Sequence, residues 1–328
     1  MIVTVTLNPS LDLTYGLEES ALGEVEVHRA RTASVEASGK GVNVSLTLHR
    51  AGTPTVAVLL LAGRTGEHVS ELLEEEGLHQ VVVPLAGQTR INTSLLLPAG
   101  GTTKVNGPGP EVGAGDVALL CAEVGRTLDV VQGEGERWLA LCGSFPPGVG
   151  EELVTALIEA AHTRGFRCVV DVSGAPLRHA LLQGADLLAP NAAELATLTA
   201  GVSTVAAREP QPGPELVAQT ARELASAHDT ALLVSLGPRG ALYIDGNLVL
   251  HATGPALTPV NTAGAGDALL AGWLSRPGEP AARLRRAMAF GRSACLSPLT
   301  VDHTPGRHAT DGITVSTVAP SSKERRAP

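Results

Sequence analysis

The segment best suited to chemistry is Asn261-Thr-Ala-Gly-Ala-Gly-Asp267, which ends in a carboxylate and runs into an apolar helical stretch over 268–274. The small residues Gly264, Ala265 and Gly266 let the backbone approach a ligand closely. Backbone N–H groups at a helix start lack helical partners, and the helix dipole makes that end attractive to anions. The segment therefore predicts an anion hole that stabilises charge on a transferring group.

Asp267 stands in the first turn of that predicted helix. A carboxylate there can take the proton of a hydroxyl held beside the anion hole, which is the arrangement that in-line phosphoryl transfer to an alcohol needs. A Gly-rich turn followed by an ordinary helix-start Asp explains the same residues. The segment alone leaves both interpretations open.

Two further polar positions are candidates for binding a hydroxylated ligand. Asp12 follows the first predicted strand and a Pro-containing turn, where a carboxylate can accept hydrogen bonds from two hydroxyls. It can equally be a turn-capping residue. Asn43 lies with Gly39, Lys40 and Gly41 at another helix start, and its amide both donates and accepts; a Gly-rich helix start with a solvated Lys40 is the alternative.

Composition excludes several other classes of protein. The net charge of −9 and the aromatic content of 2% argue against nucleic-acid binding, which needs a basic footprint and stacking rings. The four cysteines are widely spaced and none forms a C-x-x-C pair, so we expect reduced thiols in a cytoplasmic protein and no structural zinc. The sequence contains no run of eighteen consecutive apolar residues, so we expect no membrane span and no membrane partner.

Short apolar runs alternate with longer helical patterns along the 328 residues. The expected strands are 2–7, 55–61, 138–141, 168–172, 187–189 and 231–236. The expected helices are 41–51, 66–76, 115–130, 151–164, 192–200, 214–228 and 265–275. This order predicts an α/β fold with a mostly parallel sheet covered on both faces, and such sheets bind ligands beyond the carboxyl ends of their strands.

Two segments, 11–35 and 88–106, read as extended chain and interrupt that order. We expect them to form a small antiparallel sheet, with a hairpin at Ala99-Gly-Gly101, that acts as a lid over the α/β body. The body would then comprise 1–10, 36–87 and 107–315. Free edges of such a lid can pair between subunits, so a homodimer is expected. Residues 208–214 are expected to form a surface loop and 316–328 a flexible tail.

The sequence resembles the PfkB (ribokinase-like) carbohydrate kinases. Gly264-Ala-Gly-Asp267 is similar to the second signature of that family, and Ser38-Gly-Lys-Gly-Val-Asn-Val44 is similar to the first. Further similar elements follow in the family's order and cover nearly the whole chain: Thr6–Asp12, Arg90-Ile-Asn92, Asn106–Gly109, Gly143–Gly148, Asp171–Gly174, Pro190–Glu194 and Ser235–Gly240. The resemblance implies a three-layer α/β/α fold, ATP as co-substrate, Mg²⁺ and a small sugar acceptor.

The resemblance also implies roles for individual residues. Asp267 would be the base and Gly264, Ala265 and Gly266 the anion hole. The implied substrate-binding residues are Asp12, Gly39, Lys40, Asn43, Arg90 and Ser144. The implied nucleotide-binding residues are Asn191, Ser235, Gly237 and Gly240, and Glu194 would hold Mg²⁺ through water. Asn191 and Glu194 also fit a helix capping box, and ordinary turn chemistry also explains the 235–240 loop.

Lys40 and Arg90 look like the branch of the family that phosphorylates phosphosugars, the 1-phosphofructokinases and tagatose-6-phosphate kinases. There, an Arg at the position of Arg90 grips the phosphate already on the sugar, a task that suits a guanidinium fork; a solvated strand Arg is the alternative. Arg29 and Arg31 are weaker candidates for the same phosphate. The resemblance implies conversion of fructose 1-phosphate to fructose 1,6-bisphosphate, with tagatose 6-phosphate and fructose 6-phosphate as alternative substrates.

Two positions depart from the family pattern, because Ala189 stands where a Lys is common and Gly107 where a Glu is common. Neither touches the predicted base or anion hole, but both bear on the substrate. A non-catalytic sugar-phosphate-binding regulator is the alternative outside enzymes, and the retained Gly264, Gly266 and Asp267 argue against it. A dinucleotide-binding fold is excluded, since no G-x-G-x-x-G occurs in the first βα turn.

Overall fold

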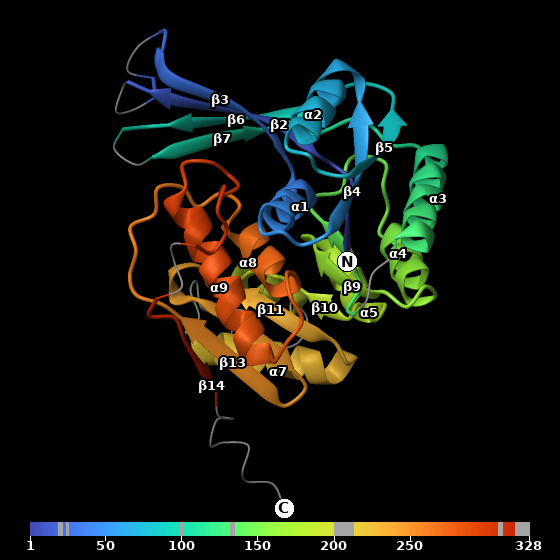
Figure 1. Cartoon of the computed structure of the whole chain (residues 1–328), viewed down its shortest axis with the longest axis vertical. Helices are drawn as coiled ribbons and strands as arrows, with labels where there is room; N and C mark the ends of the chain where they lie inside the picture. Colours follow the sequence, from blue (N-terminus) through green and yellow to red (C-terminus); the bar gives the residue numbers. More distant parts are fainter. Residues whose placement is uncertain are drawn as a thin grey trace, which may run out of the picture.

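The computed structural model describes residues 1–18, 22–23, 26–98, 101–131, 135–199, 213–307 and 311–318. These residues form one large sheet with helices on both faces and a second, small sheet that projects from the body (Figure 1). The expected α/β/α architecture with an additional small β-sheet is confirmed.

The large sheet is ten-stranded within the described part of the chain, in the order β14-β13-β12-β11-β10-β9-β8-β1-β4-β5. Its strands are β1 Ile2–Thr6, β4 Thr55–Ala62, β5 Gln80–Leu85, β8 Trp138–Cys142, β9 Arg167–Asp171, β10 Leu187–Leu188, β11 Ala231–Ser235, β12 Ala241–Asp245, β13 Leu248–Thr253 and β14 Thr314–Thr317. Strands from β5 to β11 are parallel, whereas β12, β13 and β14 continue the sheet in antiparallel pairing.

The helices divide between the two faces of this sheet. They are α1 Lys40–Arg50, α2 Gly63–Glu75, α3 Ala114–Val130, α4 Glu152–His162, α5 Ala175–Leu182, α6 Ala192–Leu198, α7 Pro214–His228, α8 Ala265–Leu274 and α9 Pro280–Leu296, with a 3₁₀ turn η2 at Gly237–Arg239. One buried cluster contains side chains of α3 to α7, and the clusters on the other face contain those of α1, α2, α8 and α9.

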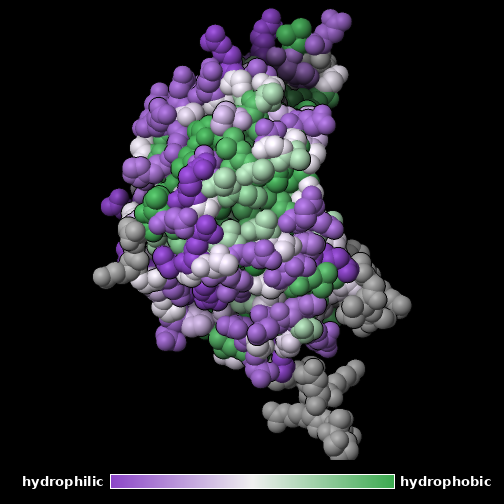
Figure 2. Space-filling model, turned by 90° about the vertical axis from the view of Figure 1, so that its right-hand side faces the viewer, coloured by the Kyte–Doolittle hydropathy of each residue, from purple (hydrophilic) through white to green (hydrophobic). Residues whose placement is uncertain are grey.

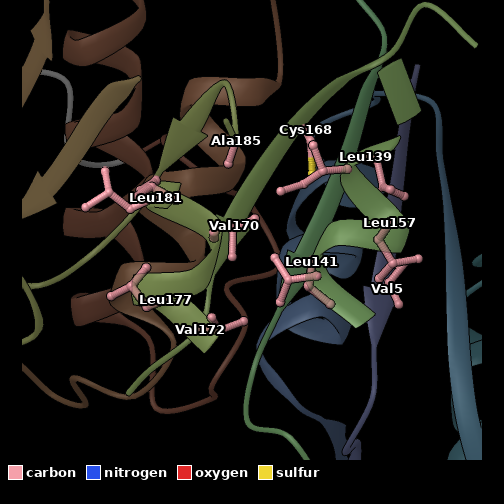
Figure 3. Close-up of a cluster of buried hydrophobic side chains, with 14 of the residues drawn as sticks. Val5, Leu139, Leu141, Leu157, Cys168, Val170, Val172, Leu177, Leu181 and Ala185 are labelled. Carbon is pink, nitrogen blue, oxygen red and sulfur yellow. The ribbon is translucent and has the colours of Figure 1, made fainter. Parts of the chain in front are cut away.

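Alternate residues of each strand supply the two cores. Leu139 and Leu141 of β8 pack in the first cluster, as does Leu157 of α4 (Figure 3). Trp138 of β8 packs in the second cluster. Burial of both faces is why these strands read as continuous apolar runs in the sequence.

The small sheet consists of β2 Ser10–Leu17, β3 Ala30–Ser38, β6 Arg90–Leu96 and β7 Thr102–Asn106, in the order β3-β2-β6-β7. The sequence predicted antiparallel pairing throughout, and for the central pair this is wrong, because β2 and β6 are parallel. The two predicted insertions each form an antiparallel pair, β2 with β3 and β6 with β7. The two pairs join through β2 and β6, which run in the same direction. Ala99 of the expected hairpin turn lies outside the described residues.

Side chains of the small sheet alternate between a polar and an apolar face, as strand geometry requires. The pairing register places the following residues on the polar face: Ser10, Asp12, Glu36, Arg90, Asn92 and Lys104. The opposite face carries Leu11, Leu13, Val35, Ile91 and Val105. Leu11 is buried in the α1–α2 core, whereas Val35, Ile91 and Val105 are exposed.

Some elements of the fold were not predicted from the sequence, and some predicted segments lie outside the described residues. The sequence patterns did not predict the helices α5 and α9, nor the strands β5 and β12 to β14. The expected surface loop lies outside the described residues except for 213–214, and Pro214 begins α7. The prediction of a flexible tail over 316–328 is wrong for residues 316–317, which belong to β14, and the tail beyond residue 318 lies outside the described residues. Hydrophobic side chains gather on the face that carries α3 and β5 (Figure 2), where Val82, Leu119 and Val130 are exposed.

All four cysteines are free. Among the described helices, none has the length and apolar character needed to cross a bilayer.

Candidate active site

Residues of the family-like motifs gather beyond the carboxyl ends of the parallel strands, as expected for this architecture. Asn8 follows β1, Ser144 follows β8, and Asp171 is the last residue of β9. The Asn8 amide donates to the hydroxyl of Ser144 at 3.2 Å, so the ends of β1 and β8 are linked. Asn191 follows β10 and forms a bridge with Ser235 at the end of β11.

The glycine-rich segment folds as the sequence predicts. Gly264 caps α8 with φ of 74°, a conformation that favours glycine. A methyl group at this position would also overlap the carbonyl oxygen of Thr300, so the 297–301 segment packs tightly against the turn. No such obstacle exists at Gly266, where an added carbon would meet nothing within 4 Å. Because position 264 requires glycine, the first-turn N–H groups of α8 follow a turn that depends on this residue.

Asp267 lies in the first turn of α8, 7 % exposed and in contact with α1 through one short hydrogen bond. The Nδ2 of Asn43 donates to its Oδ2 at 2.7 Å. Burial raises the pKa of Asp267 to about 7, helped by the nearby Asp171 carboxylate and opposed by the Asn43 bond and by Lys40. A carboxyl with this pKa can accept a proton near neutral pH, which is the property of a general base.

Lys40 and Asp171 form an ion pair next to Asp267. The Lys40 Nζ lies 2.7 Å from Asp171 Oδ1, and the Asp171 side chain is buried. Burial alone lowers the pKa of Lys40, but the Asp171 carboxylate outweighs it and holds that pKa above its ordinary value. Lys40 is therefore charged at the site, yet its charge is directed to Asp171 in this structure. The implied contact of Lys40 with a substrate phosphate stays a prediction.

Asp12 belongs to a hydrogen-bonded network on the polar face of the small sheet. Its Oδ1 accepts from the Ser10 hydroxyl at 2.6 Å and from the Asn92 amide at 2.9 Å. The Asn92 carbonyl oxygen in turn accepts from the Gly107 N–H at 3.2 Å. This network fixes one oxygen of Asp12, while no described residue donates to the other.

Arg90 lies on the same face, beside Ser10 in the parallel register. Its Nη1 donates to the Gly107 carbonyl at 3.4 Å, and its buried Nε has no partner among the described residues. Burial lowers the pKa of Arg90, and the Asp12 charge opposes that shift. An added carbon at Gly107 would crowd the Ile91 carbonyl, so glycine at this departure from the family pattern lets the chain turn close to Arg90.

The Asn191–Glu194 pair forms the capping box of α6. The Asn191 Oδ1 accepts from the Glu194 N–H at 2.9 Å, and Glu194 Oε2 accepts from the Asn191 N–H at 2.9 Å. Glu194 Oε1 also accepts from the Ser173 hydroxyl at 2.6 Å. Each carboxylate oxygen retains a further lone pair, so the capping role does not use up the acceptor capacity of Glu194.

The predicted nucleotide loop follows β11. Gly237 opens the η2 turn with φ of 60°, and Gly240 closes it with φ of 98°. A side chain at Gly240 would overlap the Ala252 carbonyl of β13, so this glycine is required by the packing of the loop whatever it binds. Gly39, in the segment similar to the first signature, has φ of 123° and packs against Pro9. This contact brings the start of α1 close to the end of β1.

Three polar residues near the site received no role from the sequence. Asp171 was part of a motif but without a function, although its position at a strand end is a signal that can be read from the sequence. Glu36 lies opposite Asp12 in the register and accepts from the Thr300 N–H at 3.3 Å, and burial raises its pKa. The charge of Lys104, in the middle of β7, lowers the pKa of Asp267. Arg31, in contrast, pairs with Glu18 on the surface at 3.3 Å.

Known proteins match this chain over nearly its whole length. The sequence profile described as "pfkB family carbohydrate kinase" matches residues 5–304. A 1-phosphofructokinase of Rhodobacter capsulatus is 31% identical over 303 residues, which cover 90% of this chain and 92% of the relative. The ATP-dependent 6-phosphofructokinase isozyme 2 of Escherichia coli is 32% identical over 304 residues, covering 90% and 93%. A crystal structure of Escherichia coli phosphofructokinase-2 with substrates and products superposes with a TM-score of 0.83 at 29% identity, covering 94% and 98%.

Proposed function

This chain belongs to the pfkB family of carbohydrate kinases, and from that premise we propose that it transfers the γ-phosphoryl group of ATP to a hydroxyl of fructose 1-phosphate, giving fructose 1,6-bisphosphate. Relatives named as 1-phosphofructokinases support this acceptor. The single observation that carries the chemistry is the buried Asp267, held by Asn43 beside the glycine-capped start of α8.

In the proposed reaction, Asp267 takes the proton of the acceptor hydroxyl while the oxygen attacks the γ-phosphorus and ADP leaves. The Asn43 amide fixes the orientation of the carboxylate and leaves the second oxygen, Oδ1, for the hydroxyl. Backbone N–H groups at 264–266 stabilise the negative charge that develops on the transferring group. Burial excludes water from the base and keeps its pKa close to the working pH.

The polar face of the small sheet is proposed to bind the acceptor. The free oxygen of Asp12 accepts from sugar hydroxyls, and Arg90 donates from Nη2, for which the described residues show no hydrogen-bond acceptor, to the phosphate already on the sugar. Gly39, Asn43 and Ser144 line the same place from the body. Acting as a lid, the small sheet would close this face over the substrate.

ATP is proposed to lie along Asn191, Ser235, Gly237 and Gly240, which the Asn191–Ser235 bridge brings together. The Glu194 carboxylate, with lone pairs left beyond its capping bonds, is the chemically suitable group to hold Mg²⁺ through water. When bound, Mg²⁺ neutralises part of the charge on the phosphates. We place the reaction in the cytoplasm, where ATP and phosphosugars occur together with reduced thiols.

The apolar face of the small sheet supports a homodimer through this sheet. Val35, Ile91 and Val105 are 43%, 45% and 61% exposed there, and both edge strands, β3 and β7, have an unpaired edge among the described residues. Light scattering of the purified chain tests the assembly, and a Val105→Glu variant should shift a dimer toward monomers.

An ATP-consumption assay over fructose 1-phosphate, fructose 6-phosphate, tagatose 6-phosphate, fructose and ribose tests the proposed acceptor. We expect the highest kcat/KM for fructose 1-phosphate. A preference for fructose 6-phosphate or tagatose 6-phosphate would transfer the proposal to that substrate, and a preference for unphosphorylated sugars would remove the role of Arg90. Binding of phosphosugars without any turnover would identify a regulator instead.

A further inference from the structure

A concave surface lies along α9, and none of its lining residues belongs to the proposed active site. It is a cleft of about 600 Å³ between α9, the end of α1 and the segment 303–307. Its lining residues are Arg50, Ala282, Arg285, Arg286, Ala289, Phe290, His303, Thr304, Pro305, Gly306 and Arg307. This volume falls within the roughly 300–1,000 Å³ typical of small-ligand sites.

The charge of this lining is opposite to that of the protein. Four arginines and one histidine line the cleft, and no Asp or Glu is among its lining residues in the part of the chain that the structure describes. The whole chain, in contrast, has 33 acidic residues against 24 Lys and Arg. A cleft with one sign of charge and low-dielectric walls concentrates counter-ions of the other sign.

Carboxylates compensate only one of these arginines within the described residues. The Arg50 Nη2 lies 2.7 Å from Glu76 Oε1 in a bidentate pair. Arg285 instead donates from Nη1 to the Ile313 carbonyl, and Arg286 donates from Nε to the Gly272 carbonyl at 3.2 Å. These acceptors are neutral, so they orient the guanidinium groups without cancelling their charge.

The neighbours of Arg286 add to the positive charge. Burial, and then the charges of Arg283 and Arg276, lower the pKa of Arg286. Arg283 is itself paired with Glu136. A guanidinium group has five N–H donors, and the side-chain hydrogen bonds of Arg286 use its Nε and Nη2, which leaves Nη1 to meet a ligand.

The floor of the cleft is apolar and closely packed. Phe290 and Ala289 of α9 are buried. Gly306 adopts φ of 75°, and a side chain there would overlap the Phe290 ring, so the 303–307 segment can pack this closely only with glycine. A cationic rim above an apolar floor fits a small ligand that combines anionic groups with a carbon skeleton.

We propose that this cleft is a second ligand site, which binds a small polyanion of the phosphorylated-metabolite class. Exposed arginines are often only solvated, and the distinction here is that they converge on a cleft with oriented guanidinium groups and no lining carboxylate. The proposal is independent of the acceptor chosen by the active site.

The test uses inorganic pyrophosphate as the probe, titrated into the full-length protein by calorimetry at low ionic strength. We expect Arg285→Ala/Arg307→Ala to weaken binding at least tenfold. Arg126→Ala is the matched control, because Arg126 is an exposed arginine on α3, far from the cleft, and should bind pyrophosphate like the wild type. The kcat with ATP and fructose 1-phosphate should stay unchanged in both variants.

Two further variants distinguish binding in the cleft from binding at the active site and from a loss of folding. Arg90→Ala removes a proposed phosphate contact of the active site and should retain the cleft-dependent binding. Arg307→Glu with His303→Ala changes two lining residues and leaves the Arg285–Ile313 bond in place, so it should weaken binding without unfolding the segment. Pyrophosphate binding that is absent in the wild type, or equal in wild type and both cleft variants, would overturn the proposal.

Discussion

The body and the small sheet present their polar residues to the proposed site in different ways. In the body, Asp267 and Asp171 are buried at a helix start and a strand end, and each has a partner at 2.7 Å. On the small sheet, Arg90 is half-buried with an unpartnered Nε, and Lys104 is exposed. The body groups are therefore fixed before substrate arrives, whereas the sheet groups retain donors for it.

With the proposed roles, the base lies in the packed body and a contact to the substrate phosphate lies on the small sheet. A base must stand within a fraction of an ångström of its target, which suits a packed core. A phosphate contact on a projecting sheet can adjust as the sheet moves. Changes in the body should therefore lower kcat, and changes on the small sheet should raise KM.

The largest effect is expected for Asp267→Asn, which removes the base but can keep the hydrogen bond from Asn43. We expect kcat to fall about 10³-fold or more, because a positioned general base contributes roughly 10²–10⁴. Substrate binding, measured by calorimetry, should stay within a few-fold of the wild type. An unchanged kcat would falsify the assignment of the base.

A smaller loss is expected for Gly264→Ala. The added methyl group strains a backbone with φ of 74° and overlaps Thr300, so the anion hole shifts and kcat should fall about 10²-fold. Gly266→Ala is the matched control, since its added carbon has open space, and it should lose far less activity. Equal losses in the two variants would argue against a special role of the turn.

On the small sheet, Arg90→Ala should raise KM for fructose 1-phosphate by about 10–100-fold, the range lost with a charged hydrogen bond of about 1.5–3 kcal/mol. The KM for ATP should change little. Arg31→Ala, which removes a surface arginine paired with Glu18, serves as control and should leave both values as they are. If KM for ATP rose as much as that for the sugar, Arg90 would not be a specific contact of the sugar phosphate, and the comparison of the body with the small sheet would fail.

The pH dependence reports the body alone. Because Asp267 must be deprotonated to act and burial raises its pKa to about 7, kcat/KM should fall about tenfold for each pH unit below that value. The measurement is a pH–rate profile of wild type and Arg90→Ala. The acidic limb should lie at the same pH in both, and an acidic limb near pH 4 would mean that burial does not raise the pKa of the base.

The smallest effect concerns stability. The folded-state pKa of Asp267 lies above its unfolded value of 3.8, so its contribution favours folding at low pH and is lost as pH rises through about 7. Asp267→Asn removes the unfavourable free energy of burying an ionised carboxylate at high pH. Its Tm should exceed that of the wild type at pH 8, and the difference should shrink toward pH 4. A lower Tm at pH 8 would show that the ionised carboxylate is stabilised by its neighbours.

Much of this arrangement could be predicted from the sequence because the parallel strands and the glycine-rich turns leave local signals. Gly264 and the apolar run after it indicate a helix start, and residues 214–228 form the helix that their pattern predicts. The parallel pairing of β2 with β6 could not be read, since it depends on how two distant hairpins meet. Lys104 and Glu36 were missed for the same reason, because their closeness to the site follows from strand register and not from a motif.

That pairing also bears on how the protein folds. Asp12 and Asn92 are 80 positions apart in the chain, so the sheet that carries Asp12 and Arg90 closes long loops before its strands can meet. Contacts of such long range form slowly, and the body contains them too, since Ile2 of β1 pairs with Trp138 of β8. The small sheet differs from the body in burial, because every residue of β7 is exposed. We therefore expect the amide hydrogens of the small sheet to be less protected from exchange than those of the central strands of the body.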